Sequence, residues 1–573
     1  MKHSTSQHGA ASPRPLPLSL LIGTFCIGIA PAMPVHAAGP AVPSAGTILQ
    51  QVEPAAPPAP PSNDTGLRIQ QPASGALPPS IAIHIEHIDI VGNTKIDTAT
   101  LHALVADAEG KDLDLPHIGE LAARITDYYH AHGFPLAHAI VPAQTLQAGT
   151  VKIEVIEARY GKIDIDNQSR VSDGLLQSTL GGLQSGDVIT QADLDRSLLL
   201  LADIAGLVVN ATLKSGAQAG TSDLIVDAAS APMFSGNLTL DNGGDAYTGR
   251  IRGGANADVY NLLHRGDTLG VSALTSGDGM RYGRASYDAL LDGSGTQLGG
   301  AYSALDYKLN GSLSTLDARG SAQTSSVWLK QPIVRSMTVN VNAQLEYDHL
   351  QLNDEIRSTG IQTDRHLDNL TATLSGDVRD GLWGGGLSLW SAGVTDGHVR
   401  FDNAVAQAED ALTTNTQGSF VKGNATLTRL QTVTARDTLY VNLTGQWASG
   451  NLDASQKLTI GGPNSVRAYD VGVLSGDTGY TFTTELRHAF GPSAYGQWEA
   501  IAFVDAAHVE VNRDALLASA NSVNLGGVGL GLNWAGPHRL AANLVVAMPV
   551  GPTPVQIGSR SSVRAWLLAS EAF

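Results

Sequence analysis

From Phe234 to the C-terminus the chain alternates apolar and polar residues in one short segment after another, and this alternation constrains the fold more than any other feature. A period of two is typical of β-strands, and an apolar outer face with a polar inner face is what a barrel with a wet lumen requires. Glycine-rich clusters such as 276–279 and 292–295 mark the turns. Three segments show the pattern by their apolar members: Val339, Val341, Ala343, Leu345 and Tyr347; Leu370, Ala372, Leu374 and Val378; and Leu439, Val441, Leu443 and Trp447.

We count about sixteen such segments, so the sequence predicts a 16-stranded antiparallel transmembrane β-barrel over residues 230–573. After residue 37 no stretch is long and apolar enough for a membrane helix, since 198–209 is interrupted by Asp203. A chain of this kind that spans a membrane must therefore do so as a closed barrel. The alternative is a soluble β-sandwich or β-helix. Aromatic residues make up only 5% of the chain, so the usual interfacial girdles would be thin, which argues against the barrel.

The first 37 residues have the composition of an export signal. They carry two basic residues and no acidic one, an apolar stretch over 16–30, and small residues that place cleavage after Ala37 or Ala38. A membrane anchor is the alternative, but the apolar stretch is short and contains a proline. Cys26 is the only cysteine and lies in this signal, so we expect a mature chain without disulfides or cysteine zinc sites.

The net charge of −18 bears on the choice of partner. An acidic chain is a poor match for nucleic acid or for an anionic membrane surface, because both repel it. We therefore expect no nucleic-acid partner.

Between the signal and the barrel, the chain predicts a linker and two small α+β units. Residues 38–80 are rich in proline and alanine, which is typical of an extended linker, with one short helix-capable piece at Gly46–Glu53. Residues 81–157 predict a strand with a bulge near Glu86, two helices stopped by glycines, and two closing strands. Residues 158–229 repeat this plan, and two copies in tandem suggest a jointed arm.

Two short motifs near the end of the barrel region carry the strongest functional signal. Val466-Arg467-Ala468-Tyr469 lies in a long connection, from about residue 450 to 477. Phe503-Val504-Asp505 lies on a following strand. The guanidinium group of arginine can hold a carboxylate with two hydrogen bonds, so we expect Arg467 to meet Asp505 on the barrel wall. The alternative is that Arg467 is a solvated loop charge.

With these motifs in this order, nearly all of the mature chain resembles the two-partner secretion transporters (TpsB type, ShlB/FhaC/HecB-like), which are relatives of the barrel-assembly protein BamA. The resemblance implies two periplasmic POTRA domains (polypeptide-transport-associated), over 81–157 and 158–229, and a barrel whose sixth external loop folds into the lumen. It also implies a lock between that loop and the barrel, formed by matched residues of the two motifs. These residues are Val466, Arg467, Tyr469, Phe503 and Asp505.

The chain departs from the family pattern at two positions, where Ala468 and Ala507 replace glycines. If the loop tip needs a positive φ at Ala468, the methyl group would strain it by roughly 1 kcal/mol or more.

Other patterns have ordinary explanations. Six of the histidines in the first unit come without a carboxylate or cysteine cluster at ligand spacing, so we interpret them as surface residues and expect no metal. They are His84, His87, His117, His130, His132 and His138. The run Gly527–Gly531 lacks the rest of a phosphate loop, and close strand packing explains it better. We find no catalytic motif and expect no enzyme activity and no cofactor.

The resemblance implies an outer-membrane protein of a Gram-negative bacterium that secretes one large β-helical partner of the haemolysin, haemagglutinin or adhesin type without ATP. Its other contact would be outer-membrane lipid, and we expect a monomer. The short helix at Gly46–Glu53 would plug the resting pore. The alternative is an assembly factor or insertase like BamA. A passive porin is a third class, but it needs no periplasmic arm.

Overall fold

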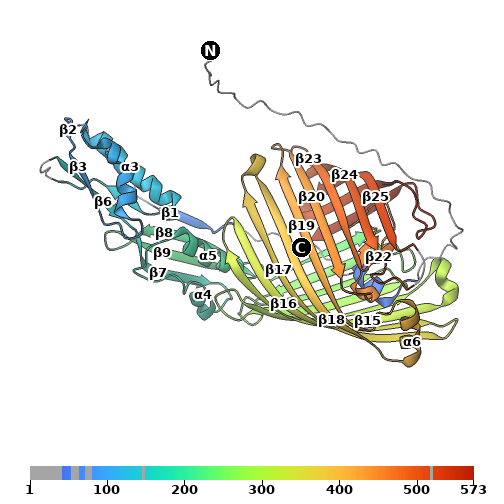
Figure 1. Cartoon of the computed structure of the whole chain (residues 1–573). Coiled ribbons are helices and arrows are strands. Elements are labelled where there is room, and N and C mark those ends of the chain that lie inside the picture. Colours follow the sequence, from blue (N-terminus) through green and yellow to red (C-terminus); the bar gives the residue numbers. More distant parts are fainter. Residues whose placement is uncertain (1–41, 53–62, 71–79, 145–148, 517–519) are drawn as a thin grey trace, which may run out of the picture.

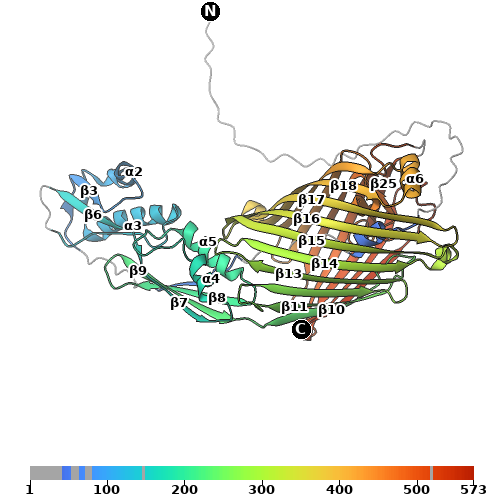
Figure 2. The same cartoon turned by 90° about the horizontal axis from the view of Figure 1, so that it is seen from below.

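The computed structural model forms an elongated arm and a barrel, and the arm lies at one end of the barrel (Figure 1, Figure 2). The export signal expected over residues 1–37, with Cys26, lies outside the described residues, as does much of the linker. None of the helices in the described part of the chain has the length and apolar composition to cross a bilayer. The described residues are 42–52, 63–70, 80–144, 149–516 and 520–573.

Two short pieces of the linker have regular structure. The helix α1 (Ala45–Val52) lies where the sequence indicated a short helix. The strand β1 (Leu67–Gln70) pairs in parallel with β8 of the second unit, with Leu67 opposite Ala211. The linker thus adds a strand to that unit's sheet, a pairing that its own sequence did not indicate.

The first unit packs two helices and a 3-10 turn on a small sheet of order β3-β6-β5, in which β3 is parallel and β5 antiparallel to β6. The expected irregularity near Glu86 is present, because the N–H groups of Glu86 and His87 both donate to the carbonyl of Gly149, at 2.9 and 3.5 Å. The chain also changes partner there, since β2 pairs with β4 whereas β3 pairs with β6. The helix α3 begins at the capping residue Asp114, whose side chain accepts the N–H of His117. The elements are β2 (Ile83–His84), β3 (His87–Val91), α2 (Thr98–Ala103), η1 (Ala106–Ala108), β4 (Asp112–Leu113), α3 (Leu115–Ala131), β5 (His138–Ile140) and β6 (Thr150–Ile156).

A buried carboxylate, Glu157, holds the first unit together at the end of β6. It accepts the backbone N–H groups of Thr94 and Lys95, both at 2.7 Å, the Thr94 hydroxyl, and the Tyr129 hydroxyl at 2.9 Å. Burial alone would raise the pKa of Glu157, but the hydrogen bonds from Thr94 and Lys95 outweigh it and lower the pKa. The charged form is therefore the one that the folded unit stabilises.

Replacing Glu157 by glutamine is expected to destabilise the first unit by about 1–3 kcal/mol at neutral pH, because an amide cannot satisfy four donors. A carboxylate whose pKa is lowered on folding contributes stability above its unfolded pKa and loses it as pH falls through the folded pKa. The difference between wild type and variant should therefore shrink on acidification. Amide hydrogen exchange of α3 measures it, and Glu120→Gln, an exposed change on the same helix, is the control. Equal exchange in wild type and Glu157→Gln at neutral pH would contradict this account.

The second unit has the same plan, with a sheet of order β1-β8-β9-β7 and one apolar core. Thr190 caps α5, because its hydroxyl accepts the N–H of Asp193. Gly206, with φ +72°, separates α5 and its short tail from β8. The elements are β7 (Arg159–Gln168), α4 (Asp173–Thr179), α5 (Gln191–Ala202), β8 (Leu207–Ser215) and β9 (Thr221–Ser230).

The remaining residues form a closed barrel of sixteen antiparallel strands, which confirms the predicted fold class. The first and last strands close it, with Asn237 opposite Ala572. The strands are β10 (Phe234–Asp241), β11 (Arg252–Tyr260), β12 (Thr268–Thr275), β13 (Met280–Leu290), β14 (Gln297–Lys308), β15 (Ala318–Arg335), β16 (Val339–Ile356), β17 (Ile361–Asp380), β18 (Gly386–Phe401), β19 (Gly418–Thr432), β20 (Asp437–Ala448), β23 (Thr478–Ala489), β24 (Gln497–Glu510), β25 (Ser522–Ala535), β26 (Leu540–Val550) and β27 (Arg564–Ala572).

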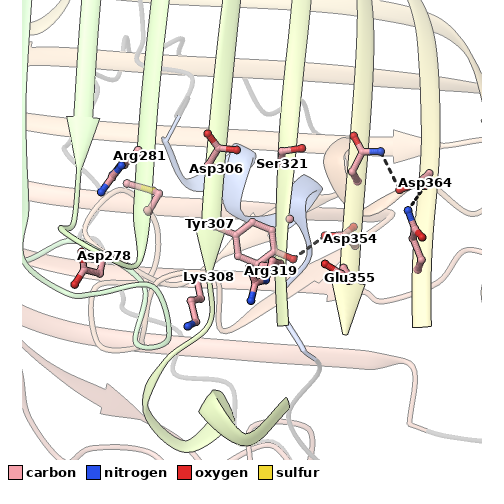
Figure 3. A pocket seen from close by; sticks show the side chains of 14 residues that line it. Asp278, Arg281, Asp306, Tyr307, Lys308, Arg319, Ser321, Asp354, Glu355 and Asp364 are labelled. Carbon is pink, nitrogen blue, oxygen red and sulfur yellow. Dashed lines mark hydrogen bonds between the residues drawn. The ribbon is translucent and has the colours of Figure 1, made fainter. Parts of the chain in front are cut away.

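The outer face of the barrel is apolar around its middle and polar toward one end. Leu345, Leu370 and Leu443, all from the alternating segments, are exposed on this face. At the end away from the arm, polar residues replace them on neighbouring strands (Figure 3), where Arg281 lies opposite Asp306 and Asp306 opposite Ser321. An apolar band bounded by polar strand ends is what a membrane-spanning barrel requires.

The arm is attached to the turns at the other end of the barrel. Asp203, at the end of α5, makes two hydrogen bonds to Arg335, with Nε at 2.6 Å and Nη2 at 2.8 Å. Arg335 is buried and also binds the side chain of Asn340 at 3.0 Å. This ion pair between Asp203 and Arg335 fixes the second unit against the barrel wall, so the arm is in direct contact with the mouth of the barrel.

Candidate functional site: the obstructed lumen

The connection between β20 and β23, residues 449–477, folds back into the barrel, and we call it the inner loop. It contains η4 (Ala454–Gln456) and a hairpin of β21 (Leu458–Ile460) and β22 (Leu474–Gly476). In Figure 1 the hairpin, labelled at β22, lies in the space that the barrel strands enclose. Val466 and Tyr469, near its tip, are buried against residues of β24, β25 and β27. The loop motif thus lies against the inner wall of the lumen.

Arg467 at the tip binds Asp505 on β24 through three hydrogen bonds. Its Nε donates to Oδ2 at 2.9 Å, its Nη2 to Oδ1 at 2.7 Å, and its backbone N–H to Oδ2 at 3.0 Å. The two side chains are only 8% and 0% exposed. Water therefore competes little for this pair, and losing one partner would leave an uncompensated buried charge, at a cost of about 3–5 kcal/mol.

Three further groups hold Arg467, of which the motifs indicated Phe503 but not Glu485 or Trp566. Glu485 on β23 accepts its Nη1 at 2.6 Å, and Trp566 on β27 donates its indole N–H to the Arg467 carbonyl at 2.7 Å. The guanidinium carbon lies 3.4 Å from the centre of the Phe503 ring, within range of a cation–π contact. Because the register pairs Glu485 with Phe503, knowledge of the strand pairing would have revealed the second carboxylate.

The two alanines that replace family glycines fit without strain. Ala468 does not have a positive φ, so the left-handed turn that would have strained it is absent. Its methyl group lies over Gly527 on β25, where an added Cβ would come within 2.9 Å of it. Gly529 makes room for the Phe503 ring in the same way, so the glycine run of β25 serves close packing, as predicted. Ala507 is buried in the same cluster.

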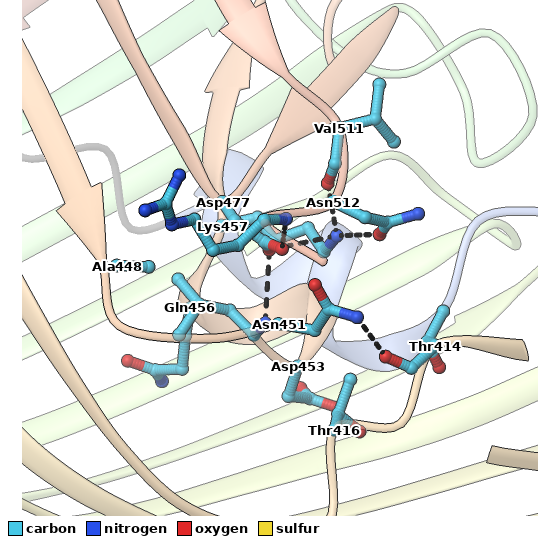
Figure 4. Close-up of polar contacts among 12 residues, drawn as sticks. Thr414, Thr416, Ala448, Asn451, Asp453, Gln456, Lys457, Asp477, Val511 and Asn512 are labelled. Carbon is cyan, nitrogen blue, oxygen red and sulfur yellow. Dashed lines mark hydrogen bonds and ion pairs between the residues drawn. The ribbon is translucent and has the colours of Figure 1, made fainter. Parts of the chain in front are cut away.

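The base of the inner loop is fastened to its neighbours by a second buried ion pair, Lys457 and Asp477 (Figure 4). Lys457 Nζ lies 3.0 Å from Asp477 and donates to the carbonyl of Val511 at 2.6 Å. Asp477 accepts the backbone N–H groups of Leu452 at 3.1 Å and Arg513 at 2.8 Å. These bonds join both ends of the loop to the connection that follows β24.

The helix α1 lies inside the barrel beside the inner loop (Figure 2). Its Ile48 and Leu49 are buried among inward-facing residues of the wall such as Tyr282 and Leu352. The side chain of Gln50 donates to the carbonyl of Ser455 in the inner loop. An isolated helix of eight residues is unstable in water, so these contacts supply its stability.

A charged network connects α1, the inner loop and the wall. Asp354 on β16 accepts the N–H of Ala45 at 2.7 Å and binds Arg365 on β17 at 2.8 Å. Arg365 Nε also donates to Asp453 of the inner loop at 2.5 Å. Arg365 and Asp453 are both 5% exposed. One arginine on the wall therefore holds the N-terminal end of the helix and the base of the loop together.

Two family models match this chain. The model described as haemolysin secretion/activation protein ShlB/FhaC/HecB matches residues 220–534, and that of the ShlB-type POTRA domain matches residues 83–158. The chain is 26% identical over 466 residues to the heme/hemopexin transporter protein HuxB of Haemophilus influenzae, covering 80% of this chain and 82% of HuxB. It is 23% identical over 475 residues to the outer membrane transporter CdiB of Dickeya dadantii, with the same coverage of 80% and 82%.

Solved structures share the architecture. CdiB from Escherichia coli superposes with a TM-score of 0.69 at 19% identity, covering 88% of this chain and 93% of CdiB. BamA from Haemophilus ducreyi lacking POTRA domains 1–3 gives a TM-score of 0.50 at 13% identity, covering 86% of this chain and all of that one. At these identities the likeness shows the fold, a 16-stranded barrel preceded by small α+β domains.

Proposed function

Since the chain belongs to the haemolysin secretion/activation family ShlB/FhaC/HecB, it is an outer-membrane transporter of two-partner secretion, and we propose that it exports one large β-helical exoprotein. The barrel spans the outer membrane and the two POTRA domains lie in the periplasm. We call the units over 81–157 and 158–229 POTRA1 and POTRA2. The relative HuxB is named as a heme/hemopexin transporter protein. We propose that the partner of this chain is either an exoprotein related to heme or hemopexin or one of the haemolysin or adhesin type.

The observation that supports a gated polypeptide channel is the lumen filled by α1 and the inner loop. Each is held by non-covalent contacts to the wall, so each can leave when a client enters. In this proposal Val466, Arg467, Tyr469, Phe503 and Asp505 form the lock that keeps the loop inside at rest. Glu485 and Trp566 extend the lock beyond those five residues.

The sheets of the arm support recognition of an unfolded client through backbone hydrogen bonds. The pairing of β1 with β8 shows that the POTRA2 sheet accepts an extended segment at its edge. In POTRA1, β5 pairs only with β6 among the described strands, so its other edge has backbone groups to offer. We assign the client's extended N-terminal region to this edge, because strand addition requires no folded partner surface.

Transport by this route requires no nucleotide. Folding of each domain-sized piece outside the cell releases about 5–15 kcal/mol, which favours outward movement over return. The members of this family are transporters, and we propose a channel without a catalytic step or cofactor, which acts as a monomer in outer-membrane lipid.

Deletion of residues 81–157 tests client recognition. Secretion of the exoprotein should be lost, whereas the barrel should still insert and conduct ions in planar lipid bilayers, because its strands and the POTRA2 contacts to Arg335 remain. Secretion is measured by immunoblotting of the culture medium. Secretion that persists without POTRA1 would exclude this unit as the receptor.

Inactivation of the gene separates secretion from barrel assembly. A dedicated secretion transporter leaves the levels of other outer-membrane proteins unchanged, whereas an insertase lowers them. A general loss of outer-membrane barrels would therefore overturn the proposed function and favour a role like that of BamA.

A further inference from the structure

POTRA1 brings together three side chains that ligate transition metals, at the end of the arm away from the barrel (Figure 2). They are His87 at the start of β3, His102 in α2, and Glu109 just after η1. Each offers one ligand atom, and these atoms all lie within 4.8 Å of one another. It is the one such group of three among the described residues. The sequence did not reveal it, because the ligands come from three elements at irregular spacing.

The distances suit a single small cation. His87 Nδ1 and His102 Nε2 each lie 3.0 Å from Glu109 Oε1. Zinc binds histidine nitrogen and carboxylate oxygen at about 2.0–2.2 Å, so two of its ligands in a tetrahedral site lie ~3.4 Å apart. Small rotations of the His87 and His102 rings, which are 61% and 31% exposed, provide the remaining few tenths of an ångström.

The ligands are attached to rigid backbone. Ile88 and Leu101, each next to a histidine, are buried in the core of POTRA1. Glu109 is followed by Gly110, which has φ +78° and donates its N–H to Ile85 at 2.7 Å. Glu109 Oε1 also accepts the N–H of Ile88 at 2.9 Å, which fixes the carboxylate from behind.

The same carboxylate oxygen faces two imidazoles and a peptide N–H, which is a crowded arrangement for hydrogen bonding alone. Without a metal, both rings must direct a proton toward Oε1; with a metal, both lone pairs and the carboxylate converge on the ion. Two imidazoles and one carboxylate form a ligand set that suits zinc and not calcium or magnesium, which prefer oxygen. The exposed side of His87 leaves a fourth position for water.

We propose that His87, His102 and Glu109 form a zinc-binding site that joins β3, α2 and the segment after η1 of POTRA1. The ion would fix α2 to the sheet of the domain that we assign to client recognition. The site itself does not depend on that assignment, since its evidence is the geometry of the ligands.

The test is isothermal titration calorimetry. The purified full-length protein is freed of metals with a chelator and is then titrated with zinc chloride in detergent. Wild type should bind one zinc ion at this site, and His102→Ala and Glu109→Gln should each weaken that binding at least tenfold. His84→Ala is the matched control, because His84 pairs with Asp112 at 2.8 Å and belongs to no group of three ligands among the described residues. The control should bind zinc as wild type does.

Hydrogen exchange distinguishes loss of the site from loss of the fold. Zinc should slow amide exchange in α2 and in residues 104–110 of wild type and of His84→Ala, but not of His102→Gln, which keeps the size of the side chain. Cobalt should give wild type the intense visible absorption of a tetrahedral site and leave His102→Gln without it. Equal zinc affinity in wild type and in both His102 variants, or no binding by wild type, would overturn the proposal.

Discussion

Secretion of the exoprotein is expected to fall at least tenfold when Arg467 is replaced by alanine. The change removes two side-chain hydrogen bonds to Asp505 and one to Glu485, and it leaves the buried Asp505 carboxylate without its cation, whereas Glu485 keeps its pairing with Arg487. Breaking a buried pair in this way costs about 3–5 kcal/mol. Since every 1.4 kcal/mol is a factor of ten, the docked loop would lose most of its advantage over undocked conformations.

The measurement compares exoprotein in the medium with the amount of barrel in the outer membrane, so that a failure of assembly is not mistaken for a failure of transport. Arg357→Ala is the matched control, because Arg357 is an exposed arginine near the end of β16 that pairs only with Glu355 in the described structure. Arg467→Lys should retain part of the activity, since lysine keeps the charge but not the fork. Normal secretion by Arg467→Ala would exclude the lock.

Removal of α1 is expected to raise the single-channel conductance several-fold. A helix with its side chains is about 10–12 Å across, which is a large part of the lumen of a 16-stranded barrel that also holds the inner loop. Ile48→Asp should have the same effect without shortening the chain, because it places a charge at a fully buried position among apolar wall residues.

Planar-bilayer recordings of the purified protein measure this effect. Thr47→Ala is the control, since within the described part of the chain the Thr47 hydroxyl bonds to Ser44 alone, and its conductance should equal that of wild type. If deletion of α1 and Ile48→Asp both leave the conductance unchanged, α1 does not obstruct the conducting path.

Much of the fold could be predicted because a period of two is a local property that each strand carries by itself. Leu345 and Leu443 face outward as their alternation indicates. The strand β1 has no such signal, since it is four residues long and its place depends on the edge of β8, far along the chain. The position of α1 could be suggested only by resemblance, because a short helix does not encode what it packs against.

The site was predictable to the same extent. Arg467 and Asp505 stand out because their motifs recur in a family, but Glu485 and Trp566 reach the same arginine only through the register of β23 and the closure of the barrel by β27. The zinc ligands illustrate the same limit, because a turn, a helix and a strand had to fold before His102 could meet Glu109.

The sharing of Arg365 between Asp354 and Asp453 has a consequence for the way this channel opens. Withdrawing the inner loop would remove Asp453 from Arg365, and withdrawing α1 would remove the Ala45 N–H from Asp354 and expose the same charges to water. The departure of one obstruction therefore weakens the contacts that hold the other. We therefore expect the two obstructions to behave as one cooperative gate, in which half-open states that would let small solutes leak from the periplasm are disfavoured.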